Sequence, residues 1–183
     1  MSKIGIFLAE SCEEIEALTV VDIFRRAKME IELISISDSK EITGSHKIQF
    51  MAETTAKEAD FSTLDGIVLP GGMPGTLHLG ESEIVNQTVQ TFAKEGKLVA
   101  AICAAPSVLG QAGVLEGKHA TCHPGFEEKL TGAITSEDKV VVDGNIITSR
   151  GMGTAIDFAL AIVKYFAGDE AVANVCKGLI YHI

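Results

Sequence analysis

Among the four cysteines of this chain of 183 residues, Cys103 lies in the sequence context best suited to a nucleophile. The apolar run before it (98–102) predicts a buried strand, and the small residues after it (104–112) predict a helix with proline in its first turn. A sulfur atom at such a corner lies near the positive end of a helix, which favours a thiolate. The corner also forces an uncommon backbone conformation, as many active sites do. The alternative is a buried structural cysteine, and the position at the corner favours the reactive thiolate.

Glu16 is the residue best suited to exchange a proton with that sulfur. It lies in a predicted helix (13–28) that is apolar in nearly every direction, which is typical of a helix buried on more than one side. Burial would raise the pKa of Glu16 and leave a protonated carboxyl group able to donate to a thiolate. Glu13 and Glu14 are interpreted instead as solvated acids that complement the helix dipole. An apolar helix in so small a domain also predicts a symmetric partner that covers it.

Two glycines and a histidine complete the candidate chemistry. Gly71 and Gly72 follow a predicted buried strand (66–69), and their unhindered N–H groups can stabilise an oxyanion. His123 follows a short predicted strand (120–122) and can move protons near neutral pH. The alternative for Gly71 and Gly72 is an ordinary turn, and the alternative for His123 is a surface histidine without a role in chemistry.

The order of strands and helices explains how these residues would meet. Strands are predicted at 3–9, 30–36, 48–53, 66–69, 98–102, 120–122, 140–142 and 146–149, and helices at 13–28, 82–95, 104–112, 154–166 and 170–177. This alternation predicts one α/β domain over residues 1–183, with a doubly wound, mainly parallel sheet between helices. Sites in such folds lie beyond the carboxyl ends of the strands. The candidate residues are therefore expected at one edge of the sheet.

Composition and charge exclude several classes of function. The net charge of −10, without a basic cluster, argues against a nucleic-acid partner. The start of the chain lacks the layout of a signal peptide and no apolar run is long enough to span a bilayer, so we expect no membrane partner and a cytoplasmic location. Four widely spaced cysteines predict free thiols. Cys122 and His123 are adjacent and chelate one ion poorly, so no metal site is predicted. The glycines at 151 and 153 fail the nucleotide-loop patterns.

Several motifs together resemble one known family. They are Glu13–Glu16, Val21–Ala27, Val68–Gly72, Ala101–Pro106 and Thr148–Thr154. In combination they are similar to the ThiJ/PfpI superfamily, in the branch of the parkinsonism-associated protein deglycase, over nearly the whole chain. The resemblance implies a flavodoxin-like α/β sandwich, a homodimer, and a cysteine at a nucleophile elbow that is hydrogen-bonded to a protonated glutamate.

The same resemblance implies a role for each candidate residue. The reactive cysteine, its glutamate partner, the glycines on the oxyanion side and the nearby histidine are Cys103, Glu16, Gly71 with Gly72, and His123. Ala104, on the substrate-binding side, stands where the protease-like branch has a histidine, which disfavours peptidase activity.

Three further positions carry expectations from the resemblance. Arg26 and the loop around His46 fall where the family has contacts near the dimer interface, with His46 in place of a frequent arginine. Cys122 replaces a small hydroxyl residue beside His123. We hypothesise that it forms a disulfide with oxidised Cys103.

The resemblance implies a glyoxalase or deglycase that needs no cofactor. Its substrates would be methylglyoxal, glyoxal and their early protein adducts, and its products lactate or glycolate. The alternative is a sensor of oxidative stress or a chaperone that works through oxidation of Cys103, because an accessible thiolate also reacts with peroxide. A role in thiamine biosynthesis rests on the historical family name alone.

Overall fold

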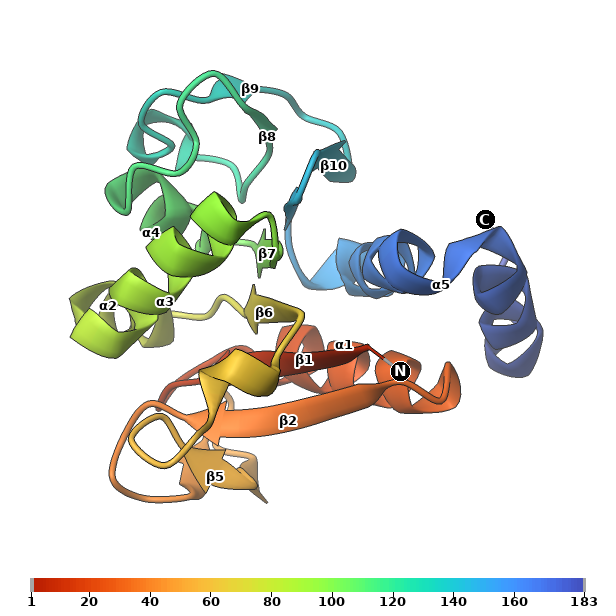
Figure 1. Cartoon of the computed structure of the whole chain (residues 1–183), viewed down its shortest axis with the longest axis horizontal. Coiled ribbons are helices and arrows are strands. Elements are labelled where there is room, and N and C mark those ends of the chain that lie inside the picture. Colours follow the sequence, from red (N-terminus) through yellow and green to blue (C-terminus); the bar gives the residue numbers. More distant parts are fainter. Residues whose placement is uncertain (1, 183) are drawn as a thin grey trace.

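A seven-stranded sheet forms the centre of the molecule in the computed structural model, which describes residues 2–182 (Figure 1). The strands, in chain order, are β1 (Lys3–Leu8), β2 (Glu30–Ser35), β3 (Glu41–Thr43), β4 (Gln49–Met51), β5 (Thr54–Thr55), β6 (Gly66–Leu69), β7 (Leu98–Ile102), β8 (His119–Ala120), β9 (Ile134–Thr135), β10 (Val140–Asp143) and β11 (Ile146–Ser149). The central sheet has the order β10-β11-β7-β6-β1-β2-β5. All neighbouring strands within this sheet pair in parallel except β10 and β11, which form an antiparallel hairpin. The doubly wound, mainly parallel sheet is therefore confirmed.

Helices cover both faces of this sheet. They are α1 (Glu14–Arg26), α2 (Gly75–Glu81), α3 (Glu83–Glu95), α4 (Pro106–Gln111) and α5 (Ala155–Leu179), with short 3₁₀ turns η1 (Phe61–Thr63), η2 (Glu127–Lys129) and η3 (Met152–Thr154). In Figure 1, α2, α3 and α4 lie on one side of the sheet and α1 and α5 on the other. Strand β1 serves both cores because its side chains alternate: Ile4, Ile6 and Leu8 pack under α1 and α5, while Phe7 packs on the opposite face.

Several predicted elements differ from the observed ones. The helix α2 was not predicted, because two glycines within it (Gly75 and Gly80) lower its helix propensity. The extended piece predicted at 48–53 is β4, which pairs with β3 in a hairpin outside the central sheet. The two predicted C-terminal helices are the halves of α5, which meet at Gly168 with φ 77°. None of the helices in residues 2–182 is long and apolar enough to cross a membrane.

The predicted strand at 120–122 requires a correction. Its residues belong in part to β8, which pairs only with β9 in a separate two-stranded sheet. His123 therefore does not follow a strand of the central sheet, and other contacts must hold it near the site.

The topology places four consecutive strands of the sheet, β11-β7-β6-β1, side by side. Their carboxyl ends lead into Arg150, Cys103, Pro70 and Ala9. This shared edge is where the site is built.

Candidate active site

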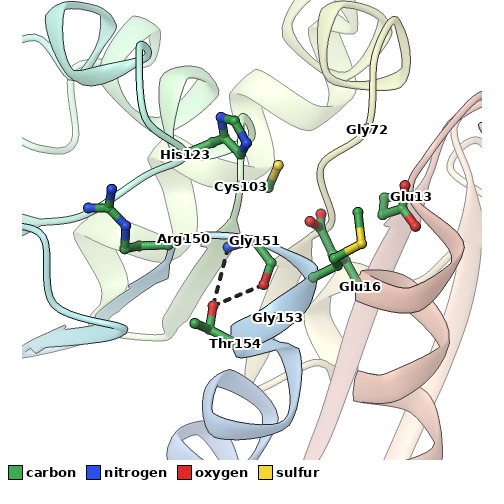
Figure 2. A pocket seen from close by; sticks show the side chains of 10 residues that line it. Glu13, Glu16, Gly72, Cys103, His123, Arg150, Gly151, Gly153 and Thr154 are labelled. Carbon is green, nitrogen blue, oxygen red and sulfur yellow. Dashed lines mark hydrogen bonds between the residues drawn. The ribbon is translucent and has the colours of Figure 1, made fainter.

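A cavity of ≈ 350 Å³ opens at this edge and brings most of the candidate residues together. Glu16, Gly72, Cys103 and His123 all line it, and Figure 2 shows the side chains of Glu16, Cys103 and His123 around one opening, with Gly72 labelled on the adjacent loop. A Cβ atom added at Gly151 would lie 3.7 Å from the His123 ring and 3.9 Å from Glu16 Oε1. Segments that are distant in the sequence therefore meet within a few ångströms.

Cys103 occupies the strand-to-helix corner in a rare conformation. Its φ is 65°, a left-handed value that side chains other than glycine seldom adopt. The backbone is held there because the Cys103 N–H donates to Ser149 O (3.0 Å) and the His123 N–H donates to Cys103 O (2.8 Å). The thiol is half-buried, whereas the other three cysteines are buried. The predicted uncommon backbone conformation at this residue is confirmed.

Glu16 is buried among the same segments. Its relative exposure is 1%, and Oε2 accepts the N–H of Gly71 at 2.9 Å. Burial raises the pKa of Glu16 to about 7, against the lowering effect of the Gly71 N–H and the Cys103 thiol. The prediction of a buried carboxyl group with a raised pKa is confirmed.

The protonation of Cys103 depends on that of Glu16. Burial and an ionised Glu16 raise the pKa of the thiol, while the N–H groups of Ala104 and Gly72 lower it. The six-residue α4 and the N–H groups at its start are therefore not sufficient to give a thiolate, and the expectation that this corner favours one is wrong. Among residues 2–182, Glu16 Oε1 has no hydrogen-bond partner. A proton on Oε1 removes the repulsion between the two groups, so that only burial still opposes a thiolate, and the N–H groups of Gly72 and Ala104 act against burial.

The two glycines have different tasks, which corrects part of the prediction. The Gly71 N–H is used by Glu16 and is not free for an oxyanion. A Cβ at Gly71 would lie 2.6 Å from Glu16 Oε2 and 2.7 Å from Cys103 Cβ, so glycine permits the close approach of the two groups. The N–H groups that interact with the sulfur are those of Gly72 and Ala104. These two are the donors available to an oxyanion.

Glu13 and Glu14 are not solvated, contrary to the prediction. Their exposures are 6% and 4%, because the loop that carries Ser45 and His46 folds over the start of α1. The Ser45 hydroxyl donates to Glu13 Oε2 (3.0 Å) and to Glu14 Oε2 (3.1 Å), and the His46 N–H donates to Glu14 Oε1 (2.8 Å). Although burial opposes it, the backbone N–H of Glu14 and the His46 groups lower the pKa of Glu14 to about 2. Glu13 also lines the cavity, which the sequence did not indicate.

His123 faces the cavity from the loop after β8. Its Nδ1 lies 3.0 Å from Pro124 O, and since a carbonyl only accepts, Nδ1 carries the hydrogen and Nε2 is left as a proton acceptor. The ring meets Phe126 edge to face at 6.3 Å between centroids. This arrangement is compatible with a proton-transfer role.

The loop that follows β11 was missed as part of the site. Arg150, Gly151, Met152, Gly153 and Thr154 form one wall of the cavity. Thr154 Oγ1 holds the loop through Gly151 N (3.2 Å) and Gly151 O (2.9 Å), the dashed contacts in Figure 2. The sequence signal for this wall is the pair of glycines, Gly151 and Gly153, just after a strand.

All four cysteines are free thiols. Cys122 is 1% exposed and packs in the core under α3 and α4, whereas Cys103 contacts the core on the opposite face of the sheet. The hypothesised disulfide between them therefore requires a rearrangement of the loop at 121–123.

We expect the Glu16→Gln variant to need a higher pH for alkylation of Cys103. The amide donates a weaker hydrogen bond to the thiolate than the carboxyl group does, so the midpoint of the rate-against-pH curve should rise by about one unit. The measurement is iodoacetamide labelling followed by mass spectrometry, with the exposed Glu95→Gln as control. A midpoint that falls would show that Glu16 is ionised beside a neutral thiol.

Comparison with known proteins agrees with this fold. The model of the DJ-1/PfpI family matches residues 2–165. Protein dj-1beta of Drosophila melanogaster is 39% identical over 98% of both chains, and the glutathione-independent glyoxalase DJR-1.2 of Caenorhabditis elegans is 33% identical over 93% of this chain and 91% of its own. The structure of oxidized Toxoplasma gondii DJ-1 superposes with a TM-score of 0.95 and 32% identity over the whole of both chains. The chain therefore belongs to the DJ-1/PfpI family.

Proposed function

We propose that the protein is a cofactor-free glyoxalase that converts methylglyoxal to lactate and glyoxal to glycolate, and that it also acts on the early adducts of these aldehydes with proteins. The observation that carries the proposal is the pair formed by Cys103 and Glu16, in which burial favours a proton on the carboxyl group beside the sulfur. The glyoxalase name of the Caenorhabditis elegans relative supports the same chemistry.

The site offers a group for each step. The Cys103 thiolate adds to the aldehyde carbon, and the new alkoxide takes the proton of Glu16 while facing the N–H groups of Gly72 and Ala104. Glu16, now a carboxylate, removes the hydrogen from that carbon and returns it to the neighbouring ketone carbon, with His123 as an aid. The resulting thioester of lactate is hydrolysed by water, which frees the thiolate. One carbon is oxidised and its neighbour reduced, so no external oxidant is needed.

The test is the formation of lactate from methylglyoxal, followed by NMR, in the absence of glutathione. The wild-type protein should form lactate well above the uncatalysed rate. An equal rate with and without protein would overturn the proposal.

A second function, sensing of peroxide, is favoured by the exposure of Cys103. It is the only half-buried cysteine among residues 2–182, and the other three are buried. Peroxide transfers oxygen to a thiolate in two steps to give a sulfinate, which a protonated Glu16 can stabilise by a hydrogen bond.

Graded peroxide should add the mass of two oxygen atoms to Cys103 before any other cysteine changes. Intact-mass measurement and peptide mapping check this. Earlier oxidation of Cys12, Cys122 or Cys176 would remove the sensor role. The homodimer and the cytoplasmic location stay predictions.

A further inference from the structure

Three side chains that can bind a metal ion converge at the start of α1. One potential ligand atom from each of Glu13, Glu14 and His46 lies within 4.8 Å of the other two. The two glutamates are buried and His46 is exposed. Ser45, the residue before His46, brings a hydroxyl oxygen into contact with all three. These four residues form the acid–histidine cluster.

Backbone hydrogen bonds orient one oxygen of each carboxylate into the cluster. Glu14 Oε1 accepts the N–H groups of His46 (2.8 Å) and Ile48 (3.4 Å). Glu13 Oε1 accepts the N–H of Ile15 (3.4 Å). In both residues the other oxygen, Oε2, contacts the hydroxyl and the imidazole of the cluster. Carboxylates that bind metal ions are held by hydrogen bonds in this way.

The loop that carries His46 is fixed by its own backbone. Gly44 N–H donates to Ile48 O at 3.0 Å, and Lys47 N–H donates to Gly44 O at 3.1 Å. A Cβ atom at Gly44 would collide with the carboxyl group of Glu14, so glycine is what lets the loop close over this carboxylate. The cluster is therefore formed by a folded turn.

The cluster has more short contacts than hydrogens to fill them. Ser45 Oγ lies 3.0 Å from Glu13 Oε2, 3.1 Å from Glu14 Oε2 and 3.0 Å from His46 Nδ1. His46 Nδ1 lies 3.5 Å and 3.3 Å from the same two carboxylate oxygens. In either charge state of the histidine, only Ser45 Oγ and His46 Nδ1 carry a hydrogen, one each. At most two of the five contacts therefore contain a linear hydrogen bond, and the others bring lone pairs together.

The charges of the cluster are also unbalanced. Among residues 2–182, neither carboxylate forms an ion pair with a lysine or an arginine, and His46 is their only partner. Two ionised carboxylates beside one protonated imidazole still leave a net negative charge. Buried charges in proteins are normally paired or coordinate metal ions. A divalent cation with a neutral histidine would balance the two carboxylates.

The spacing of the four atoms suits a metal ion. An ion with bonds of ~2.1 Å in tetrahedral geometry holds its ligand atoms ~3.4 Å apart. Five of the six separations within the cluster are 3.0–3.5 Å. The ligand atoms therefore need to move little to surround an ion.

We propose that Glu13 Oε2, Glu14 Oε2 and His46 Nδ1 bind one divalent transition-metal ion, with Ser45 Oγ or water completing its coordination. Two carboxylates and one imidazole suit Zn²⁺ or Mn²⁺. Ca²⁺ and Mg²⁺ are bound through oxygen, and Cu⁺ prefers sulfur, so these ions fit the ligand set less well. In the complex, His46 keeps its hydrogen on Nε2.

This metal site would lie at the rim of the active site. Glu13 also lines the active-site cavity, and Figure 2 shows it near Glu16. The ion has no part in the proposed glyoxalase chemistry. Metal binding and lactate formation are therefore measured separately, and either proposal can fail without the other.

The experiment is a titration of the protein with Mn²⁺, in which EPR measures the free ion. Mn²⁺ is the probe because it prefers oxygen and imidazole ligands to thiolates, so the cysteines compete weakly. We expect the wild type to bind one Mn²⁺ per chain. His46→Gln and Glu14→Gln should each weaken binding at least about tenfold. Glutamine at position 14 keeps the Oε1 acceptor for the loop N–H groups, and the side chain of His46 is exposed, so both variants should fold.

Two control variants locate the ion. The exposed His119→Gln makes the same replacement outside the cluster, and Cys103→Ala removes the thiol of the active site. Both should keep the wild-type affinity for Mn²⁺. The proposal is overturned if the wild type binds no Mn²⁺ at millimolar concentration, if His46→Gln binds as tightly as the wild type, or if Cys103→Ala loses the ion. Should Glu14→Gln fail to fold, His46→Gln alone decides.

Discussion

The Cys103→Ala variant is expected to form lactate from methylglyoxal at least about a thousandfold more slowly than the wild type. Cys103 is the group that forms the covalent bond to the aldehyde, and no other thiol lines the cavity in residues 2–182. Cys103→Ser should be nearly as inactive, because a serine hydroxyl beside a protonated Glu16 has no base strong enough to ionise it.

The matched control is Cys176→Ala. Cys176 is 8% exposed, packs from α5 into the core and lies outside the cavity, so its replacement should leave the rate of lactate formation within about twofold of the wild type. The measurement is lactate by NMR at several protein concentrations. More than a tenth of wild-type activity in Cys103→Ala would exclude a covalent role for this sulfur.

The Gly72→Ala variant is expected to lose about 3 kcal/mol or more of stability. Gly72 has φ 90°, where an L side chain is strained. A Cβ there would lie 2.3 Å from the backbone nitrogen of Glu13 and 2.7 Å from the carbonyl carbon of Cys12. Backbone atoms cannot rotate away as a side chain can, so the loop before α1 would have to shift.

The Gly96→Ala variant is the control that carries backbone strain without a steric clash. Gly96 ends α3 with φ 75°, and a Cβ there meets nothing within 4 Å. It should therefore cost only about 1 kcal/mol, the penalty of the left-handed backbone. Urea denaturation of both variants gives the two free energies of unfolding. Equal losses would contradict the close approach of Gly72 to the loop at 11–13.

Most of the fold was predictable because its signals are local. The buried run 98–102, the Ser82 cap with Gly96 past the helix end, and the Asp143-Gly144-Asn145 turn each act over a few residues. The short strands β3, β5, β8 and β9 were missed or misplaced because so few residues carry no clear period.

The site was predictable where one segment determines it and not where two must meet. Cys103 and Glu16 were identified from their own corner and helix. The burial of Glu13 and Glu14 depends on a loop more than thirty residues away, and the use of the Gly71 N–H by Glu16 depends on a contact across 55 residues. Periodicity in one segment contains no information on such contacts.

The use of four neighbouring strands to build one site has a consequence during synthesis of the chain. β11, the last of the four, ends at Ser149, so the ribosome must release nearly the whole chain before the edge exists. Until then Glu16 and Cys103 are solvated groups with ordinary acidity. A nascent chain therefore carries only ordinary thiols, and the special surroundings of Cys103 appear together with the finished fold.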